Sequence, residues 1–274
     1  MMSSMTEPKV VHRTDFDRAT ASVPLEGAPG RFSVDLDAGW SSLVGVHGGY
    51  SCALSVWAAE ALAPDRRVRT VSASFLRSGA VGPAALAVHE VRRGRSVTTL
   101  SSELTQGDHV LNVSRMTLMT EQSGAEWGER WPVDLPPPAA CVPFEAPVEL
   151  KSFRRFELRF DPERMPFHGQ RAHIVGYVRP LENRPIDTAW LVMAVDCFPP
   201  PAFALVEAPT GGMSVDLTVH IHRSGFVAGD EGWLVGSFEV CDSAGGLAVE
   251  RGRITTLDGT IVADSFQTRF TARG

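Results

Sequence analysis

The chain has 274 residues, of which 43% are hydrophobic and 21% are charged, and its formal net charge is −6. This length is enough for one large core or for two domains of about 100–150 residues each. An acidic chain offers no basic field for nucleic acid or an anionic membrane, so we expect neither partner. The first residues lack the apolar core of a secretion signal, and no long apolar run occurs, so we expect a cytoplasmic location.

The cysteines and histidines show no metal-binding pattern. The chain has four cysteines, none of them in a CxxC pair: Cys52, Cys141, Cys197 and Cys241. In a reducing compartment such cysteines are expected to be free and buried. His220 and His222 lie two residues apart on one strand face, but no third ligand is evident, so we expect no bound metal.

A pair of glycines introduces a long apolar segment of the chain. Residues 31–37 alternate apolar and polar side chains, which predicts a strand, and a loop then leads to Gly48 and Gly49. Residues 51–62 are rich in alanine and contain no glycine or proline, which predicts a buried helix that ends before Pro64. Free N–H groups at the start of such a helix favour an anion or a polarised carbonyl.

The remainder of the first half is rich in β-forming residues. Short turns that contain glycine separate the runs, which predicts an antiparallel meander. The predicted strands cover residues 68–76, 84–92, 97–105 and 109–119. We expect this sheet to wrap around the buried helix.

Residues 121–150 differ in character from the rest of the chain, with three consecutive prolines at 136–138 and the isolated Trp127 and Trp131. Proline runs favour extended linkers, so this segment is interpreted as a linker. It would separate an N-terminal domain over residues 1–120 from a C-terminal domain over residues 151–274. We expect the two tryptophans to hold the linker against the body of the protein.

The second half repeats the order of the first. A second buried helix is predicted at residues 187–198, with Asp187 as its N-cap and prolines as its stop. Strands are predicted on both sides of it, at residues 153–160, 173–180, 214–222, 232–241, 246–257 and 259–270.

Two pairs of turns indicate an internal duplication. The sequence FLRSG at residues 75–79 matches IHRSG at 221–225, and the glycine turn at 106–107 matches that at 258–259. The predicted fold class is therefore α+β, with each copy made of one helix and one curved antiparallel sheet.

The order and spacing of these motifs, from about residue 30 to residue 272, resemble the double-hotdog acyl-CoA thioesterases of the thioesterase II type. The motifs are the Gly-Gly helix start, the FLRSG turn, the basic turn at residues 92–95 and the segment at 258–267. The resemblance implies two tandem hotdog domains and hydrolysis of an acyl-CoA or acyl-carrier thioester in lipid metabolism. It further implies a homo-oligomer, and coenzyme A as part of the substrate with no separate cofactor.

The resemblance also implies a catalytic set of Asp, Gln and Thr that holds a water molecule. The Asp falls on Asp216, in the run that ends at His222-Arg223, and the Gln falls on Gln267, after the Asp-Gly turn. The Thr has no clear counterpart, so Ser243 is the expected substitute, since its hydroxyl is a better donor than the thiol of Cys241.

These residues suit thioester hydrolysis, which needs an activated water and a site for the negative charge on the carbonyl oxygen. Asp216 would activate the water and Gln267 would orient it, while the amides of Gly48 and Gly49 would hold the oxyanion. The first copy has Thr70 where the second has Asp216, so we expect one site per chain, spanning both copies.

Other residues near these motifs are assigned to substrate binding or left with two roles. His47 and Tyr50 flank the glycines, and His47 would act as a general base or hydrogen-bond a loop carbonyl. Arg93 and Arg95 would contact the phosphates of coenzyme A or would simply be solvated. Asp196, on the second predicted helix, is a rival carboxylate that we expect to cap or pair.

Two alternatives to hydrolysis stay open. One is a hotdog dehydratase or hydratase acting on a 3-hydroxyacyl thioester, with His47 and Asp216 as acid and base, although the Asp-x-Asn-Pro-x-His signature of such hydratases is absent. The other is a non-catalytic protein that binds acyl thioesters.

Overall fold

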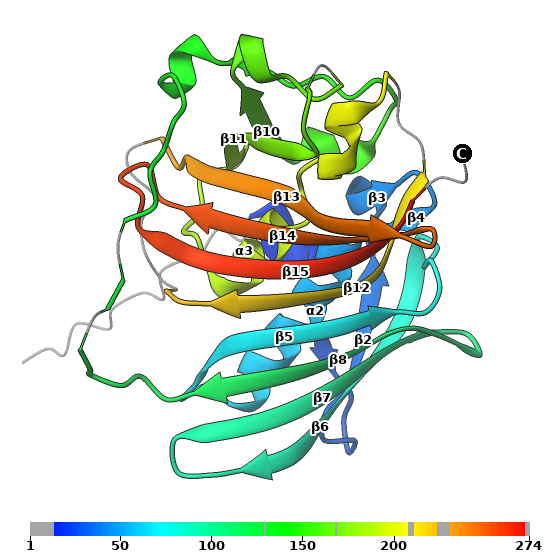
Figure 1. The fold of residues 1–274 in the computed structure, drawn as a ribbon. Coiled ribbons are helices and arrows are strands. Elements are labelled where there is room, and N and C mark those ends of the chain that lie inside the picture. Colours follow the sequence, from blue (N-terminus) through cyan, green and yellow to red (C-terminus); the bar gives the residue numbers. More distant parts are fainter. Residues whose placement is uncertain are drawn as a thin grey trace, which may run out of the picture.

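The structure is a computed structural model, and it describes residues 14–125, 127–128, 130–167, 169–207, 211–223 and 231–271. Figure 1 shows one long sheet that curves around helices packed on its inner face. None of the helices among these residues is both long enough and apolar enough to span a bilayer.

The first half contains the predicted strand, helix and meander. Helix α1 (Asp15–Ala19) and strands β1 (Val23–Pro24) and β2 (Arg31–Leu36) come first, followed by the 3-10 helix η1 (Ala38–Trp40) and a small hairpin of β3 (Ser41–Ser42) and β4 (Gly45–Val46). Helix α2 (Gly48–Leu62) leads to strands β5 (Arg67–Phe75), β6 (Gly82–Arg93), β7 (Val97–Gln106) and β8 (His109–Met119).

The second half follows a segment with little regular structure. That segment holds the 3-10 helices η2 (Pro138–Ala140) and η3 (Lys151–Arg154) and strand β9 (Val142–Pro143). The second half then consists of β10 (Phe156–Phe160), η4 (Pro162–Arg164), β11 (His173–Pro180), α3 (Thr188–Ala194), η5 (Pro201–Leu205), β12 (Gly211–Ile221), β13 (Leu234–Ala244), β14 (Leu247–Thr255) and β15 (Ile261–Thr271).

The sheet carries a local two-fold symmetry. Within the described residues, thirteen strands form one antiparallel sheet in the order β1-β2-β6-β7-β8-β5-β12-β15-β14-β13-β11-β10-β9. The run from β2 to β5 is therefore repeated in reverse by the run from β12 to β11. At the centre, Thr218 and Ser72 pair directly, and their hydroxyl oxygens lie 3.1 Å apart. These residues are 146 positions apart, the shift of the FLRSG repeat, so the duplication and the double-hotdog architecture are confirmed.

Helix α2 lies in the interior because it is apolar on every side. Buried residues cover its whole length from Gly49 to Ala59 except Trp57, and its neighbours are α3 and the strands β5 to β8. A helix without a polar face has no orientation in which it can lie on a surface, so the sheet curves around it.

Helix α3 is shorter than the sequence predicted. It has seven residues, and the expected N-cap is confirmed, because the Asp187 carboxylate accepts a hydrogen bond from Trp190 N at 2.8 Å. The chain leaves the helix at Val195, ahead of the prolines at 199–201. Asp196 and Cys197 consequently lie just beyond the helix and not on it.

The two tryptophans of the segment at 121–150 behave differently. Trp131 holds this segment to the second half, because its backbone N–H donates to Gly259 O at 2.8 Å and the guanidinium of Arg253 lies 4.4 Å from the centre of its ring. Trp127 is 90% exposed, so the expectation that it also packs against the body is wrong. The division into domains at 121–150 stays a prediction.

Three of the four cysteines are buried as expected: Cys52, Cys141 and Cys197. Cys241 is exposed on β13, so the expectation is wrong for this residue. In the second copy of the repeated turn, Ser224 and Gly225 lie outside the described residues.

Candidate active site

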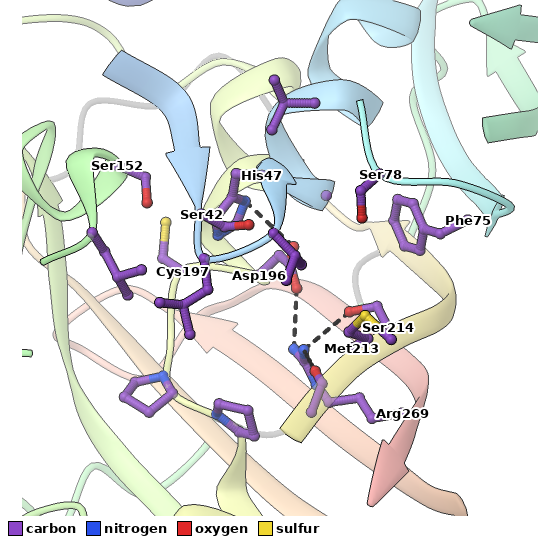
Figure 2. Close-up of a pocket in the computed structure, with 18 of the residues that line it drawn as sticks. Ser42, His47, Phe75, Ser78, Ser152, Asp196, Cys197, Met213, Ser214 and Arg269 are labelled. Atoms are coloured by element: carbon purple, nitrogen blue, oxygen red, sulfur yellow. Dashed lines mark hydrogen bonds and ion pairs between the residues drawn. The ribbon is translucent and has the colours of Figure 1, made fainter. Parts of the chain in front are cut away.

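A cavity of about 530 Å³ lies between the two halves, at the start of α2. The first half contributes the β3–β4 hairpin, the start of α2 and the end of β5, and the second half contributes the chain after α3 and parts of β12 and β15. Most of its wall is apolar, and Figure 2 shows a group of polar side chains that face one another within it. A site that draws on both copies agrees with the expectation from the sequence.

Asp196 is the buried centre of this polar group (Figure 2). Its Oδ2 accepts a hydrogen bond from Gly49 N at 2.8 Å and lies 3.4 Å from His47 Nδ1. Its Oδ1 accepts hydrogen bonds from Gln267 Nε2 at 2.9 Å and from Arg269 Nη2 at 3.1 Å. Both oxygens are therefore held by fixed groups.

The electrostatics of this cluster favour a carboxylate next to a neutral imidazole. Burial raises the pKa of Asp196, but the positive charge of Arg269, the imidazole of His47 and the hydrogen bonds from Gln267 and Gly49 outweigh it, so the net pKa lies below the usual value. Burial lowers the pKa of His47, and Arg269 lowers it further against the opposing effect of Asp196. At neutral pH, His47 is thus an uncharged base.

The glycines at the start of α2 allow the carboxylate to approach the helix. A Cβ atom on Gly49 would lie 2.9 Å from Asp196 Cβ, and one on Gly48 would lie 3.0 Å from Asp196 Oδ2. Any larger residue would push the chain after α3 away from α2. The free N–H groups and the dipole of α2 then stabilise the negative charge placed there.

Arg269 fixes the other side of Asp196. Its Nε donates to Glu250 Oε2 at 2.8 Å, and its Nη1 donates to Ser214 Oγ at 3.0 Å and to a backbone carbonyl of β12 at 3.1 Å. Its Nη2 donates to Asp196 and, at 2.8 Å, to Gln267 Oε1. All five N–H groups of the guanidinium are used, so Arg269 positions the cluster and has no donor left for a ligand.

Of the predicted catalytic residues, Gln267 is in the cluster and Asp216 is not. Gln267 is buried and bonds to Asp196 and to Ser214 Oγ. Asp216 is half-buried, does not line the cavity, and accepts a hydrogen bond from Thr268 N at 3.2 Å.

Strand alternation explains this placement. Asp216 pairs with Thr268 and Leu217 pairs with Gln267, so Leu217 shares the inner face with Gln267 and Asp216 points to the other face of the sheet. A β-bulge between Ser214 and Asp216, where two steps along β12 match one step along β15, brings Ser214 to the side of Gln267.

Comparisons with known proteins agree with this fold. The family model of the acyl-CoA thioesterase N-terminal domain matches residues 36–120, and that of the C-terminal domain matches residues 132–270. The chain belongs to the acyl-CoA thioesterase family. No protein with a curated description gives a significant match.

Solved structures share the same architecture over nearly the whole chain. A hotdog-fold protein of unknown function from Alicyclobacillus acidocaldarius is 23% identical, with a TM-score of 0.87, and the match covers 96% of this chain and 99% of that one. A thioesterase II candidate from Thermobifida fusca is 25% identical, with a TM-score of 0.83 and the same coverage. Acyl-CoA thioesterase II TesB2 from Mycobacterium marinum is 22% identical, with a TM-score of 0.75, over 94% of this chain and 98% of that one.

Ser243, the third predicted catalytic residue, lies away from the cavity. Ser243 is exposed near the end of β13, as is Cys241, and neither lines the cavity. The structure therefore does not bring Ser243 to Gln267, and the hydroxyl next to that amide belongs to Ser214.

The predicted substrate-binding residues divide in the same way. His47 and Gly48 line the cavity. Gly49 donates its N–H to Asp196, so it holds the carboxylate and is not free to bind an oxyanion. Among the described residues no acceptor contacts Gly48 N, which leaves this amide as a free donor at the start of α2, next to the cavity.

Tyr50 is a core residue. Its side chain is fully buried, its hydroxyl donates to Ala19 O at 2.8 Å, and its ring stacks on Trp40 with centroids 5.8 Å apart. These contacts tie α1 and α2 together and leave the hydroxyl away from the cavity, so the substrate-binding role predicted for Tyr50 does not fit its position.

The basic turn between β6 and β7 is also outside the site. Neither Arg93 nor Arg95 lines the cavity, and Arg93 Nε pairs with Glu90 Oε2 at 2.7 Å. Their predicted contact with phosphate groups has no support from this placement.

Two members of the cluster carried weak signals in the sequence. Asp196 is a single carboxylate in an apolar stretch, three residues before a proline run, and such a group is rarely buried unless it is paired. Arg269 is two residues after Gln267, so strand alternation alone places both on one face.

Proposed function

We propose that this chain hydrolyses the thioester of an acyl-CoA or of a carrier-bound acyl group in the cavity beside Asp196. The observation that carries the proposal is the buried carboxylate of Asp196, which is held by Gly49, Gln267 and Arg269 and lies next to His47 at the wall of an apolar cavity. Membership of the acyl-CoA thioesterase family supports the same reaction class.

In the proposed mechanism, Asp196 orients the imidazole of His47. His47 Nδ1 lies 3.4 Å from Asp196 Oδ2, and the mechanism assigns the ring proton to Nδ1, so that Nε2 is left as a proton acceptor. Nε2 takes a proton from a water molecule as the water oxygen attacks the thioester carbon. The carbonyl oxygen becomes an oxyanion, which the free N–H of Gly48 stabilises at the positive end of α2.

Collapse of the tetrahedral intermediate completes the reaction. The C–S bond breaks, the imidazolium of His47 returns its proton to the leaving sulfur, and the products are the free acid and the free thiol. Asp196 stabilises the imidazolium in between, because the opposite charges lie close together in a site with little water. The apolar wall, with Phe75 and Leu111 from the first half and Phe198 from the second, accommodates the acyl chain.

Thiol release from acyl-CoAs of graded chain length tests the proposal. Asp196→Asn should lower the rate by about 100- to 10,000-fold, because the variant loses the charge that orients and stabilises His47. Asp216→Asn is the matched control: it changes another carboxylate of the second half, and the rate should stay within about twofold of wild type. Circular dichroism confirms that both variants are folded.

The outcomes distinguish the candidates. If Asp216→Asn abolishes release while Asp196→Asn does not, the catalytic carboxylate is Asp216 and the mechanism above is wrong. If the wild type binds acyl-CoAs without releasing thiol, the chain is an acyl-thioester binding protein.

The contact between His47 and Asp196 also favours a second candidate, addition or removal of water at a 3-hydroxyacyl thioester, since the same pair could act as acid and base. Incubation with a 3-hydroxyacyl-CoA separates the two reactions. Dehydration produces an absorbing enoyl thioester and no thiol, and hydrolysis produces thiol and no enoyl product.

A further inference from the structure

The turn that follows β5 forms a rigid part of the cavity rim. The N–H groups of Leu76 and Arg77 both donate to Leu111 O, at 2.8 and 3.1 Å, and Gly79 O accepts from Val46 N at 2.9 Å. A Cβ atom on Gly79 would lie 2.7 Å from Leu111 Cδ1. The turn is therefore wedged between strand β8 and the β3–β4 hairpin, and its position at the rim is fixed.

This turn presents two polar side chains with unused hydrogen-bonding capacity. Arg77 and Ser78 are exposed, and both line the cavity. Within the part of the chain that the structure describes, neither side chain has a hydrogen bond or ion-pair partner. The guanidinium of Arg77 is thus a free cation at the mouth of the site.

The other charges of the cavity do not compete with it. Among the described residues that line the cavity, the charged ones are Arg77, Asp196 and Arg269. Asp196 and Arg269 are paired with each other, and every N–H of Arg269 is used. An anionic group that enters the cavity mouth therefore meets Arg77 as its available partner.

We propose that Arg77, with Ser78 as a second donor, binds a phosphate group of the thiol carrier of the substrate. The inference rests on the proposed thioesterase function and locates the entry of the carrier. A guanidinium matches two phosphate oxygens with two parallel N–H groups, and a hydroxyl adds a third donor. In coenzyme A and in carrier-bound phosphopantetheine, the pantetheine arm separates the phosphate from the thioester, so its binding group belongs at the rim and not at the floor.

The test is the affinity for free coenzyme A, measured by isothermal titration calorimetry. Arg77→Glu should weaken binding by about tenfold or more, because it replaces an attraction for phosphate with a repulsion. Arg31→Glu is the matched control: Arg31 is an exposed arginine on β2 that does not line the cavity, and this variant should bind like wild type. Arg95→Glu tests the basic turn as the competing phosphate site.

Shorter carriers identify the source of the phosphate. With pantetheine, which has no phosphate, Arg77→Glu and wild type should bind equally. A loss with both coenzyme A and 4′-phosphopantetheine assigns Arg77 to the phosphate next to the pantetheine arm, which carrier proteins share. A loss with coenzyme A alone assigns it to the nucleotide phosphates and favours coenzyme A as the carrier.

The proposal is wrong if Arg77→Glu binds coenzyme A as tightly as Arg31→Glu does, if Arg95→Glu is the variant that loses affinity, or if wild type binds coenzyme A and phosphopantetheine no better than pantetheine. Binding of the free carrier needs no hydrolysis. A chain that binds coenzyme A through Arg77 but releases no thiol would therefore contradict the proposed function and leave this assignment intact.

Discussion

At the scale of single residues, the site depends on a buried charge cluster that is stable only while complete. Arg269 lies between the buried carboxylates of Asp196 and Glu250 and neutralises part of both. Burial raises the pKa of Glu250, and Arg269 opposes that rise. Removing one partner from such a cluster leaves the remaining buried charges without compensation. The resulting loss in the free energy of unfolding is larger than the net stabilisation that the intact ion pair contributes.

Arg269→Gln should therefore destabilise the fold strongly. We expect the free energy of unfolding to fall by about 3–5 kcal/mol, because two buried carboxylates lose their partner. Urea denaturation measures the change. The control is Arg251→Gln, which breaks an exposed ion pair with Glu239 on the outer face of the sheet and should cost less than about 1 kcal/mol. Equal losses in the two variants would contradict a structural role for the buried cluster.

The titration of His47 reports directly on its contact with Asp196. The negative charge of Asp196 raises the pKa of His47 against the larger effect of burial, so Asp196→Asn should move the titration of His47 to lower pH. The thiols of Cys52 and Cys197 also lie near Asp196, but burial raises the pKa of both, so they stay neutral in this range.

Nuclear magnetic resonance of the imidazole signals measures this shift, and His47→Gln assigns the resonance. Asp216→Asn should leave the titration of His47 unchanged. A shift to higher pH in Asp196→Asn would mean that Asp196 is not the charge that His47 contacts.

For the wild type, activity should be lost as the pH falls through the lowered pKa of His47, below its ordinary value of 6.5, since protonation removes the base.

At the scale of elements, the start of α2 and the end of α3 make the site together. The helices meet where Gly49 contacts the chain after α3, and the close approach depends on the missing side chain. The backbone of Gly49 is helical, so alanine would suit the helix itself, and the conflict would be with Asp196 Cβ at 2.9 Å and Met193 O at 3.1 Å.

Gly49→Ala should push α2 and the chain after α3 apart. It should lower the catalytic rate strongly and the free energy of unfolding moderately. We expect a loss of about 1–3 kcal/mol from overpacking, together with at least a tenfold fall in kcat, since a small displacement of Asp196 disturbs His47. Thermal unfolding and thiol release measure the two effects. Gly124→Ala, at a glycine with open space around it, should change neither. Unchanged kcat in Gly49→Ala would show that this contact does not position the carboxylate.

At the scale of the whole molecule, a symmetric scaffold carries two different ends. The run of strands β2-β6-β7-β8-β5 in the first half matches the run β11-β13-β14-β15-β12 in the second, and the two runs meet at the pair Ser72 and Thr218 (Figure 1). At one end of the helix pair, α2 begins against Asp196 and the cavity lies beside it. At the other end, α3 begins at Asp187, whose carboxylate pairs with the buried Arg184 at 2.5 Å.

Helix α1 packs against this second end, because Arg184 also pairs with Asp17 at 3.3 Å and lies 4.3 Å from the centre of the Phe16 ring. Arg184 also lines a separate cavity of about 680 Å³ on this side of the molecule. Duplication thus supplied the scaffold, and the two ends of the helix pair carry different side chains. The expectation of one site per chain stays a prediction.

The sequence by itself determined what depends on local pattern. Alternation predicted the strands, an all-apolar segment predicted the buried helix α2, and repeated turns predicted the duplication, because each of these depends on neighbours in the chain. The glycine motif placed His47 and Gly48 at the helix start, the resemblance to the family singled out Gln267, and the structure puts all three at the site.

Only the tertiary structure decided which carboxylate joins them. Asp196 is 71 positions from Gln267 in the chain, and the two meet only after the last strand closes over α3. Asp216 fits the family pattern, but it alternates with the buried Leu217 and Val219, so its side chain lies on the other face of the sheet. A bulge between Ser214 and Asp216 turns Ser214 toward Gln267 instead, and this bulge is visible only in the pairing with β15.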